Sequence, residues 1–346
     1  MNDLFVVVLG VILAGMMIWG FRFLPEERWQ MLAAIPLRKH ENGSWSGLNL
    51  TFYGMLSAVA YAAALAILIL LMGSSGIELP LLCLPTIPVL LVAVPSAKIL
   101  ARIIEKKKGT FTVGGASFAA ILVIPWIAAG INTLFDQHLD VMVFLAAFSI
   151  AYTFGEALGR LACISFGCCY GKPLDECGRI TNIIFSRFNF VFIGKTKKIA
   201  YASGMDGRKM IPIQAVTSVL YAGAGLAGTG LFLHGHFRSA LMITIAVTQV
   251  WRVISEFFRA DFRGTWGFSA YQIMALISVF YMAAIVIAAP AKESMALPDI
   301  SMGLSSLWQP GSLLMVQGFW LMAFLYTGRS VVTGSSIRFH VISEII

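Results

Sequence analysis

Two pairs of opposite charges stand at the ends of apolar segments, where they could bind a charged ligand. Arg160 follows Glu156 by four residues, and Glu256 follows Arg252 by four. Residues at this spacing share one face of a helix, so each pair can neutralise itself where the dielectric is low. A charge beside a bilayer costs on the order of 2.5–3.5 kcal/mol on insertion scales and is a functional candidate by default. The alternative for each residue is a structural or interfacial ion pair.

Three arginines indicate what such a site would bind. Arg160, Arg252 and Arg259 each present a planar guanidinium group, whose donors match phosphate oxygens better than a lysine does. If the three converge, they form a clamp for the phosphate of an anionic phospholipid such as phosphatidylglycerol. We therefore predict a membrane phospholipid as the donor and binding partner.

Four of the five cysteines fall within fifteen residues: Cys163, Cys168, Cys169 and Cys177. Beside the arginine cations, Cys168 or Cys169 is expected to have a pKa below the free value of about 8.5 and to act as a thiolate nucleophile. Glu256 or Glu156 would then accept the proton. The competing interpretation is a tightly packed re-entrant loop in which small residues allow close helix approach.

The cysteine spacing fits neither the disulfide framework of a small secreted domain nor a standard zinc motif. Adjacent cysteines rarely both bind one tetrahedral ion, and no histidine stands nearby in the sequence. We predict no metal and no cofactor, although thiol redox chemistry is not excluded.

The composition places these residues in a membrane protein. The chain has 346 residues, of which 58% are hydrophobic and only 12% charged, and its mean hydropathy is +0.83. These values are far from those of a soluble domain. Every spanning segment must be helical, because lipid offers no partner for backbone N–H and C=O groups. The net charge of +8 is what basic membrane loops accumulate, so we predict no nucleic-acid partner.

Apolar runs predict an all-α, polytopic helical bundle with eight transmembrane helices and a substantial loop region after the fifth. The expected spans are 4–23, 50–72, 79–97, 111–135, 141–159, 211–233, 240–258 and 270–290. A ninth segment, 313–327, is short enough to lie in the interface, and 298–312 before it has the composition of a linker. We divide the chain into an extra helix with a basic loop (1–49), a membrane core (50–290) with a head loop (160–210), and a C-terminal part (291–346).

Basic residues separate the loops into two sides. The head loop 160–210 holds nine Lys or Arg, whereas the loops 73–78 and 136–140 hold none. By the positive-inside rule the basic side is cytoplasmic and the N-terminus is outside. The predicted location is therefore a bacterial cytoplasmic (inner) membrane.

Five short motifs occur in order between about Leu50 and Ala289. They are Leu50-Thr-Phe-Tyr53-Gly54, Val113-Gly114-Gly115-Ala116, Gly159-Arg160-Leu-Ala-Cys163-Ile-Ser-Phe-Gly167-Cys168-Cys169-Tyr170-Gly171, Ile211-Pro212-Ile-Gln214 and Arg252-Val-Ile-Ser-Glu256-Phe-Phe-Arg259-Ala-Asp261. Together they resemble the prolipoprotein diacylglyceryl transferases, integral membrane enzymes that move a diacylglyceryl group from phosphatidylglycerol onto a cysteine thiol. The resemblance implies that a phospholipid-dependent transferase site is built from these motifs.

The chain also departs from that pattern. The family's histidine falls at Val113, its signature asparagine at Cys163 and its signature glutamate at Cys168. The family's signature region also faces outward, whereas the basic head loop here predicts a cytoplasmic position. The residues retained from the family are Tyr53, Arg160, Gln214, Arg252, Glu256 and Arg259.

We therefore expect a divergent transferase with an unknown, non-lipoprotein acceptor, in which Tyr53 joins the catalytic group and Gln214, Glu156 and Cys163 join the substrate-binding group. Three alternatives stay open. They are a prolipoprotein diacylglyceryl transferase proper, a membrane enzyme of thiol-redox or metal chemistry, and a lipid-binding or transport protein without catalysis.

Overall fold

The computed structural model describes residues 1–105, 112–135, 139–260, 268–290 and 296–346, and most of them are helical. Eight helices in this described part are long and apolar enough to cross a membrane. They are α1 (Asn2–Phe23), α2 (Phe52–Ser74), α3 (Leu79–Glu105), α4 (Val113–Leu134), α5 (Val141–Phe166), α8 (Ile213–Leu233), α9 (Phe237–Glu256) and α10 (Ala270–Ala288). Each corresponds to one predicted span, so the expected eight helices are confirmed.

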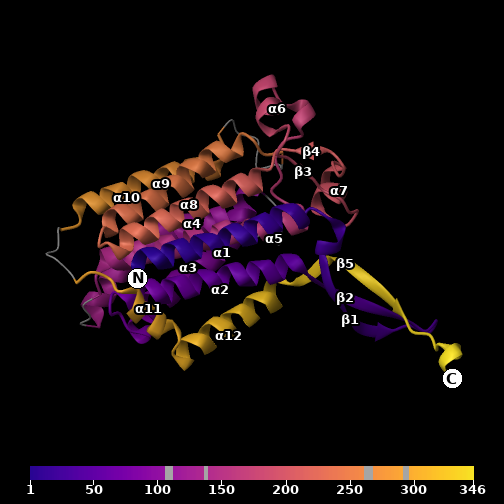
Figure 1. Ribbon diagram of the computed structural model, residues 1–346, viewed down its shortest axis with the longest axis horizontal. Helices are drawn as coiled ribbons and strands as arrows, with labels where there is room; N and C mark the ends of the chain where they lie inside the picture. The colour runs from indigo at the N-terminus through magenta and orange to yellow at the C-terminus, as the bar shows by residue number, and fades with distance from the viewer. Residues whose placement is uncertain (106–111, 136–138, 261–267, 291–295) are drawn as a thin grey trace.

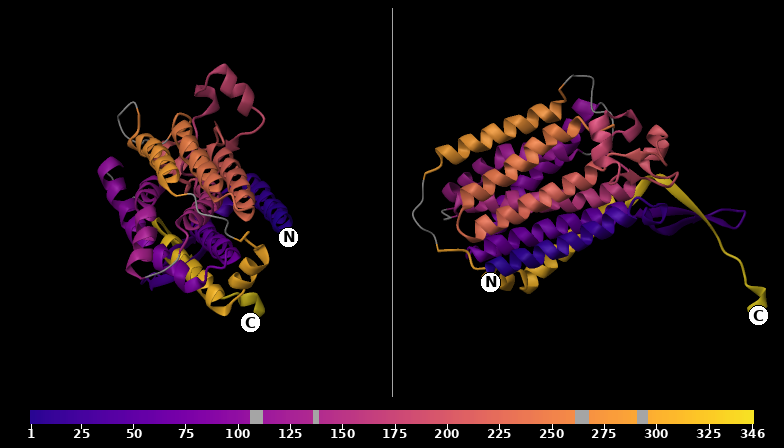
Figure 2. Two further views of the ribbon diagram at one scale, coloured as in Figure 1. Left: turned by 90° about the vertical axis from the view of Figure 1, so that its left-hand side faces the viewer. Right: turned by 45° about the horizontal axis from the view of Figure 1, so that its top comes forward.

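Successive long helices run in alternating directions, so their connections gather at two opposite ends of the bundle (Figure 1). The segments after α1, α5 and α9 lie at one end, which we call the head end. The N-terminus lies at the other end, as the right-hand view of Figure 2 also shows. Helix α5 lies at the centre, where it packs against α2, α8 and α9. This arrangement brings the loops predicted to be basic to the same end.

Local sequence signals begin and end the helices that carry the site. The Asp140 side chain caps α5 by accepting bonds from the backbone N–H groups of Met142 and Val143. The same helix ends at Gly167, whose backbone is left-handed at φ 69°. Helix α5 thus extends seven residues beyond the predicted span, and Cys163 lies in its last turn and not in a loop.

Outward-facing apolar side chains cover much of the bundle. Val7 on α1, Leu91 on α3 and Phe280 on α10 are 62%, 69% and 72% exposed. A water-soluble protein would bury most such side chains, whereas lipid is an apolar solvent for them. The helices and their exposed faces together indicate a multi-pass membrane protein.

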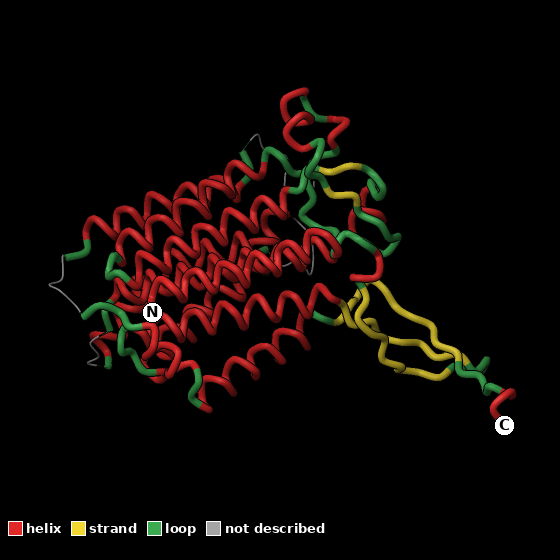
Figure 3. The backbone as a smooth tube through the Cα atoms, viewed as in Figure 1, coloured by secondary structure: helices red, strands yellow, loops and turns green. Residues whose placement is uncertain are grey.

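The fold is mostly helical, as predicted, and a β-sheet that was not predicted lies at the head end (Figure 3). Strand β1 (Met31–Lys39) and strand β2 (Ser44–Thr51) form an antiparallel hairpin, and β5 (Arg329–Arg338) pairs antiparallel with β2. The two terminal parts of the chain, predicted as separate units, therefore share one sheet. No local pattern predicts this pairing, because β2 and β5 are almost 300 residues apart.

The C-terminal part is more ordered than a linker. Helix α11 (Ile300–Leu307) and helix α12 (Pro310–Thr327) both pack against α2. Segment 298–312 thus contains a helix, which corrects its prediction as a linker. Helix α12 contains the predicted ninth segment, 313–327, but is not among the eight helices that are long and apolar enough to cross a membrane. It contacts α2 so closely that a Cβ at Gly54 would lie 2.0 Å from the Cα of Gly328.

The head region, residues 167–212, joins α5 to α8 with short elements. These are η2 (Leu174–Glu176), α6 (Arg179–Phe185), β3 (Phe190–Val191), α7 (Lys198–Ser203) and β4 (Lys209–Met210), and β3 pairs with β4. Its first residues also form backbone hydrogen bonds with the segment after α9. The backbone N–H of Lys172 donates to the carbonyl of Phe258, and the backbone N–H of Ala260 donates to the carbonyl of Tyr170. The ends of α5 and α9 are therefore tied together.

Candidate functional site

A charged network joins α5 and α9 near the head end. Arg160 Nη2 lies 2.6 Å from Glu156 Oε2, and Arg252 Nη2 lies 3.2 Å from the same oxygen. Arg252 Nη2 also donates to the Tyr152 hydroxyl at 2.8 Å. The side chains of Arg160, Glu156 and Arg252 are only 15%, 9% and 11% exposed. Two guanidinium groups thus share one buried carboxylate.

This geometry confirms one predicted ion pair and replaces the other. Glu156 and Arg160 form the expected i,i+4 contact within α5. Arg252 was expected to pair with Glu256 on its own helix, but it instead reaches across to Glu156 on α5. Glu256 Oε1 lies 3.9 Å from Nη1 of Arg259, the third predicted arginine. The spacing along one helix could not reveal this cross-helix contact.

Gly114 at the start of α4 leaves room for Arg252. A Cβ at Gly114 would lie 2.9 Å from Arg252 Nη1 and 3.1 Å from the Tyr271 ring. A side chain at this position would therefore require the guanidinium group of Arg252 or the Tyr271 ring to shift. The motif that begins at Val113 therefore contributes to the site through Gly114, whose lack of a side chain makes space for Arg252.

Three of the four clustered cysteines meet at the C-terminal end of α5. The sulfur atoms of Cys163, Cys168 and Cys169 all lie within 4.8 Å of one another, whereas Cys177 lies outside this group and donates to the carbonyl of Pro173. Cys169 has φ 56° and is the only non-glycine residue with positive φ in the described part of the chain. A left-handed residue of this kind is uncommon and turns the chain sharply. We call these three residues the cysteine cluster.

The expected thiolate at Cys168 is not favoured by this environment. Hydrogen bonds with the thiols of Cys163 and Cys169, followed by burial, raise the pKa of Cys168 well above its ordinary value. The predicted lowering of the pKa by arginine is therefore wrong for Cys168, because neighbouring thiols and desolvation dominate. Burial and the neighbouring thiols therefore favour the protonated form of Cys168.

Two further predicted residues lie beside the cysteine cluster. Gln214, at the start of α8, is buried and donates from Nε2 to the carbonyl of Cys168 at 2.9 Å. The ring of Tyr53 packs on Phe166, with 5.3 Å between ring centroids. Arg160 lies within electrostatic range of both Cys163 and Cys169. The arginine network and the cysteine cluster are therefore neighbours.

Three buried polar atoms at this site have no hydrogen-bond partner among the described residues. They are Nε of Arg160, Nε of Arg252 and Oε1 of Gln214. Buried polar groups are nearly always satisfied in folded proteins, by protein, water or ligand. Two unused donors on the guanidinium groups fit an anionic ligand.

Sequence reasoning missed two residues. Tyr152 stands four residues before Glu156, so the helical period could have placed it beside the ion pair. Lys197 carries no such signal, yet it is fully buried and donates from Nζ to the carbonyls of Leu24 and Ser165. It ties the head region to the ends of α1 and α5.

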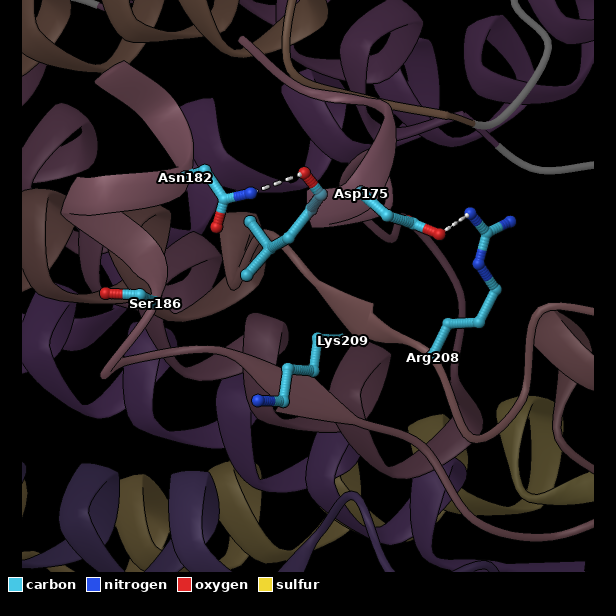
Figure 4. A pocket seen from close by; sticks show the side chains of 6 residues that line it. Asp175, Asn182, Ser186, Arg208 and Lys209 are labelled. Carbon is cyan, nitrogen blue, oxygen red and sulfur yellow. Dashed lines mark hydrogen bonds and ion pairs between the residues drawn. The ribbon is translucent and has the colours of Figure 1, made fainter. Parts of the chain in front are cut away.

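A separate hollow of about 350 Å³ lies in the head region (Figure 4). Its polar lining includes Asp175, Asn182, Arg208 and Lys209, and Arg208 forms an ion pair with Asp175 at 2.6 Å. No residue of the arginine network or the cysteine cluster lines it. Asp261 of the last motif lies outside the described residues, so the structure does not place it.

The fold and the site define a multi-pass membrane protein with a buried, cationic and thiol-rich centre near one end of its bundle. Comparison of the chain with protein-family models, curated proteins and solved structures finds no match. The resemblance to the diacylglyceryl transferases therefore rests on the ordered motifs alone.

Proposed function

We propose that this chain is a phospholipid-dependent transferase of the membrane, in which Arg160 and Arg252 bind the phosphate of an anionic lipid. The observation that carries the proposal is the sharing of one buried carboxylate, Glu156, by two guanidinium groups. Both arginines are retained from the motifs that resemble the diacylglyceryl transferases. Their neighbourhood includes Tyr53 and Gln214, which the same resemblance assigns to the site.

Charge balance supports a phosphodiester as the ligand. Arg160, Arg252 and Glu156 together keep one positive charge at a position largely closed to water. An uncompensated charge in a low dielectric is costly, and a lipid phosphodiester supplies one negative charge. The free Nε donors of both arginines suit a planar, charge-assisted contact with phosphate oxygens.

The transfer step follows from the chemistry that the resemblance implies. A sulfur nucleophile attacks the glycerol carbon that carries the phosphate, a C–S bond forms, and the C–O bond breaks. The departing glycerol phosphate keeps the electron pair, and its charge is stabilised by the guanidinium groups. The thiol proton passes to a base, for which Glu256 is the retained carboxylate. Cys168 or Cys169 is the nucleophile in the chain, and the final acceptor is not a secreted lipoprotein.

The orientation of this site follows from the basic head end. We propose that the head region faces the cytoplasm of a bacterial inner membrane, because residues 167–212 hold eight Lys or Arg. A membrane-impermeant maleimide tests this with Ser186→Cys, an exposed position beyond α6. Labelling above the wild-type background is expected only in broken cells. Equal labelling in intact cells would place the head region outside.

Lipid binding is the first test of the proposed function. The full chain is purified in detergent, mixed with phosphatidylglycerol, and examined by native mass spectrometry. Arg160→Gln should reduce lipid retention at least about tenfold, the effect of losing a charged hydrogen bond. Arg208→Gln is the matched control, because Arg208 is an arginine of the head region that pairs with Asp175 and Glu176 away from the site. Equal retention by wild type and Arg160→Gln would overturn the phosphate clamp.

Covalent transfer is tested by intact-protein mass after the same incubation. A diacylglyceryl adduct on the wild type, absent in Cys168→Ala and Cys169→Ala together, supports the nucleophile. Bound lipid with neither adduct nor released glycerol phosphate would favour the alternative of a lipid-binding or transport protein.

A further inference from the structure

The cysteine cluster is more compact than its proposed role as a nucleophile requires. One reactive thiol needs a base and a substrate, but here three sulfur atoms lie within 4.8 Å of one another. Four zinc-bound sulfurs at about 2.3 Å from the ion are separated by about 3.8 Å. Contraction by roughly 1 Å would therefore bring these sulfurs to ligand spacing.

The backbone explains how adjacent cysteines can face one point. Gly167 and Cys169 are both left-handed, at φ 69° and 56°. The chain thus turns sharply on either side of Cys168 and directs Cys168 and Cys169 toward Cys163 in the last turn of α5. In an extended or helical segment, neighbouring side chains diverge, which is why adjacency argues against a shared ion. At this turn the sulfur atoms of Cys168 and Cys169 instead lie close together.

We infer that Cys163, Cys168 and Cys169 bind one Zn²⁺ ion as thiolates and leave its fourth position open to an exogenous ligand. Thiolate sulfur is the ligand type that selects soft metal ions. Three protein ligands with one open position are the arrangement of catalytic zinc sites, whereas structural sites are closed by four. Cys163 and Cys169 are half-buried and Cys168 is buried.

The charges around the cluster favour a divalent ion. In the lipid-free protein the arginine network keeps one positive charge, and three thiolates with Zn²⁺ keep one negative charge, so the two groups balance each other until a lipid phosphate binds. Cu(I) on the same thiolates would leave one excess negative charge. Arg160 lies within electrostatic range of Cys163 and Cys169, so the charges of the arginine network and of the cysteine cluster act on each other.

Binding is an exchange of protons for metal, with no change of oxidation state. Each of the three thiols releases one proton to solvent, and three Zn–S bonds form. Gln214 positions one ligand indirectly by holding the carbonyl of Cys168. A zinc-bound cysteine is a thiolate, because the ion displaces the proton of the thiol.

The test measures metal binding in the absence of lipid, so its result is independent of the proposed transferase activity. The full chain in detergent is freed of metal by dialysis against a chelator and titrated with Zn²⁺ in competition with a chromophoric chelator. One ion per chain is expected. Cys163→Ala and Cys169→Ala should each weaken binding by about 100-fold or more, since even outer-shell changes cost 10–100-fold. Cys83→Ala and Cys177→Ala, outside the cluster, should bind as the wild type does.

Two further measurements do not depend on the stability of the variants. Co²⁺ added to the wild type should produce near-ultraviolet thiolate-to-cobalt bands, and Zn²⁺ should protect three thiols from alkylation. The inference is overturned by an absence of these bands, by equal Zn²⁺ affinity in Cys163→Ala, or by binding of Cu(I) without Zn²⁺. A disulfide between two of the three cysteines in anaerobically purified protein would also overturn it.

Discussion

Arg252 of α9 donates to the same carboxylate oxygen of Glu156 that Arg160 already contacts within α5, at 3.2 Å and 2.6 Å. The contact links two helices that are about one hundred residues apart in the sequence. It also defines a buried position with excess positive charge.

Glu156→Gln should strongly destabilise the protein. The substitution leaves two buried guanidinium groups without their carboxylate, and breaking a buried ion pair costs about 3–5 kcal/mol. The midpoint of thermal unfolding in detergent measures the effect. Glu176→Gln is the control, because Glu176 pairs with Arg208 in an exposed part of the head region and should change the midpoint little. Equal unfolding midpoints for both variants would show that the Glu156 carboxylate does not stabilise the protein.

Gly114→Ala should displace Arg252 and weaken lipid retention. The added Cβ would lie 2.9 Å from Arg252 Nη1 and 3.1 Å from the Tyr271 ring, and overpacking of this kind costs about 1–3 kcal/mol. Gly130→Ala in the same helix meets nothing within 4 Å. It should be neutral or slightly stabilising, since alanine is the better helix former. The idea fails if both variants retain phosphatidylglycerol equally in native mass spectrometry.

Lys197 should make stability depend on alkaline pH. Burial lowers the pKa of Lys197 to about 8, although Glu27 opposes the shift. In the unfolded chain a lysine has a pKa of about 10.4. Between these values the unfolded chain binds the extra proton, so the contribution of Lys197 to stability rises as pH increases from about 8 to about 10.

The comparison with Lys197→Met isolates this contribution. The difference in unfolding midpoint between the wild type and Lys197→Met should shift in favour of the wild type across that pH window. At all pH values the variant also leaves the carbonyls of Leu24 and Ser165 without this donor. Lys195→Met, at an exposed position of the same loop, should follow the wild type. A pH-independent difference for Lys197→Met would show that its pKa is not lowered.

Gly54→Ala should detach the C-terminal part from the bundle. The new Cβ would lie 2.0 Å from the Cα of Gly328, where α12 meets α2 and where Thr51 donates to the Gly328 carbonyl at 2.9 Å. Backbone must move to relieve this clash, so β5 should separate from β2. Hydrogen exchange of residues 329–338 should become faster. Gly318→Ala, which meets nothing within 4 Å on α12, should leave that exchange unchanged.

Composition and apolar period by themselves determined the eight long helices, their order and the end at which the basic loops gather. Lipid permits only helices or closed barrels, so the count of apolar segments decides the architecture. The i,i+4 contact of Glu156 with Arg160 was predictable for the same reason, because it depends on one helical period.

Only the tertiary structure decided what lies between helices. The pairing of β2 with β5, the reach of Arg252 to Glu156 and the room left by Gly114 all depend on contacts distant in sequence. The convergence of Cys163, Cys168 and Cys169 depends on the left-handed backbone of Cys169, a conformation that non-glycine residues seldom adopt. For this reason the sequence predicts that adjacent cysteines do not face one point. The raised pKa of Cys168 likewise follows from neighbouring thiols and burial, and a sequence records neither.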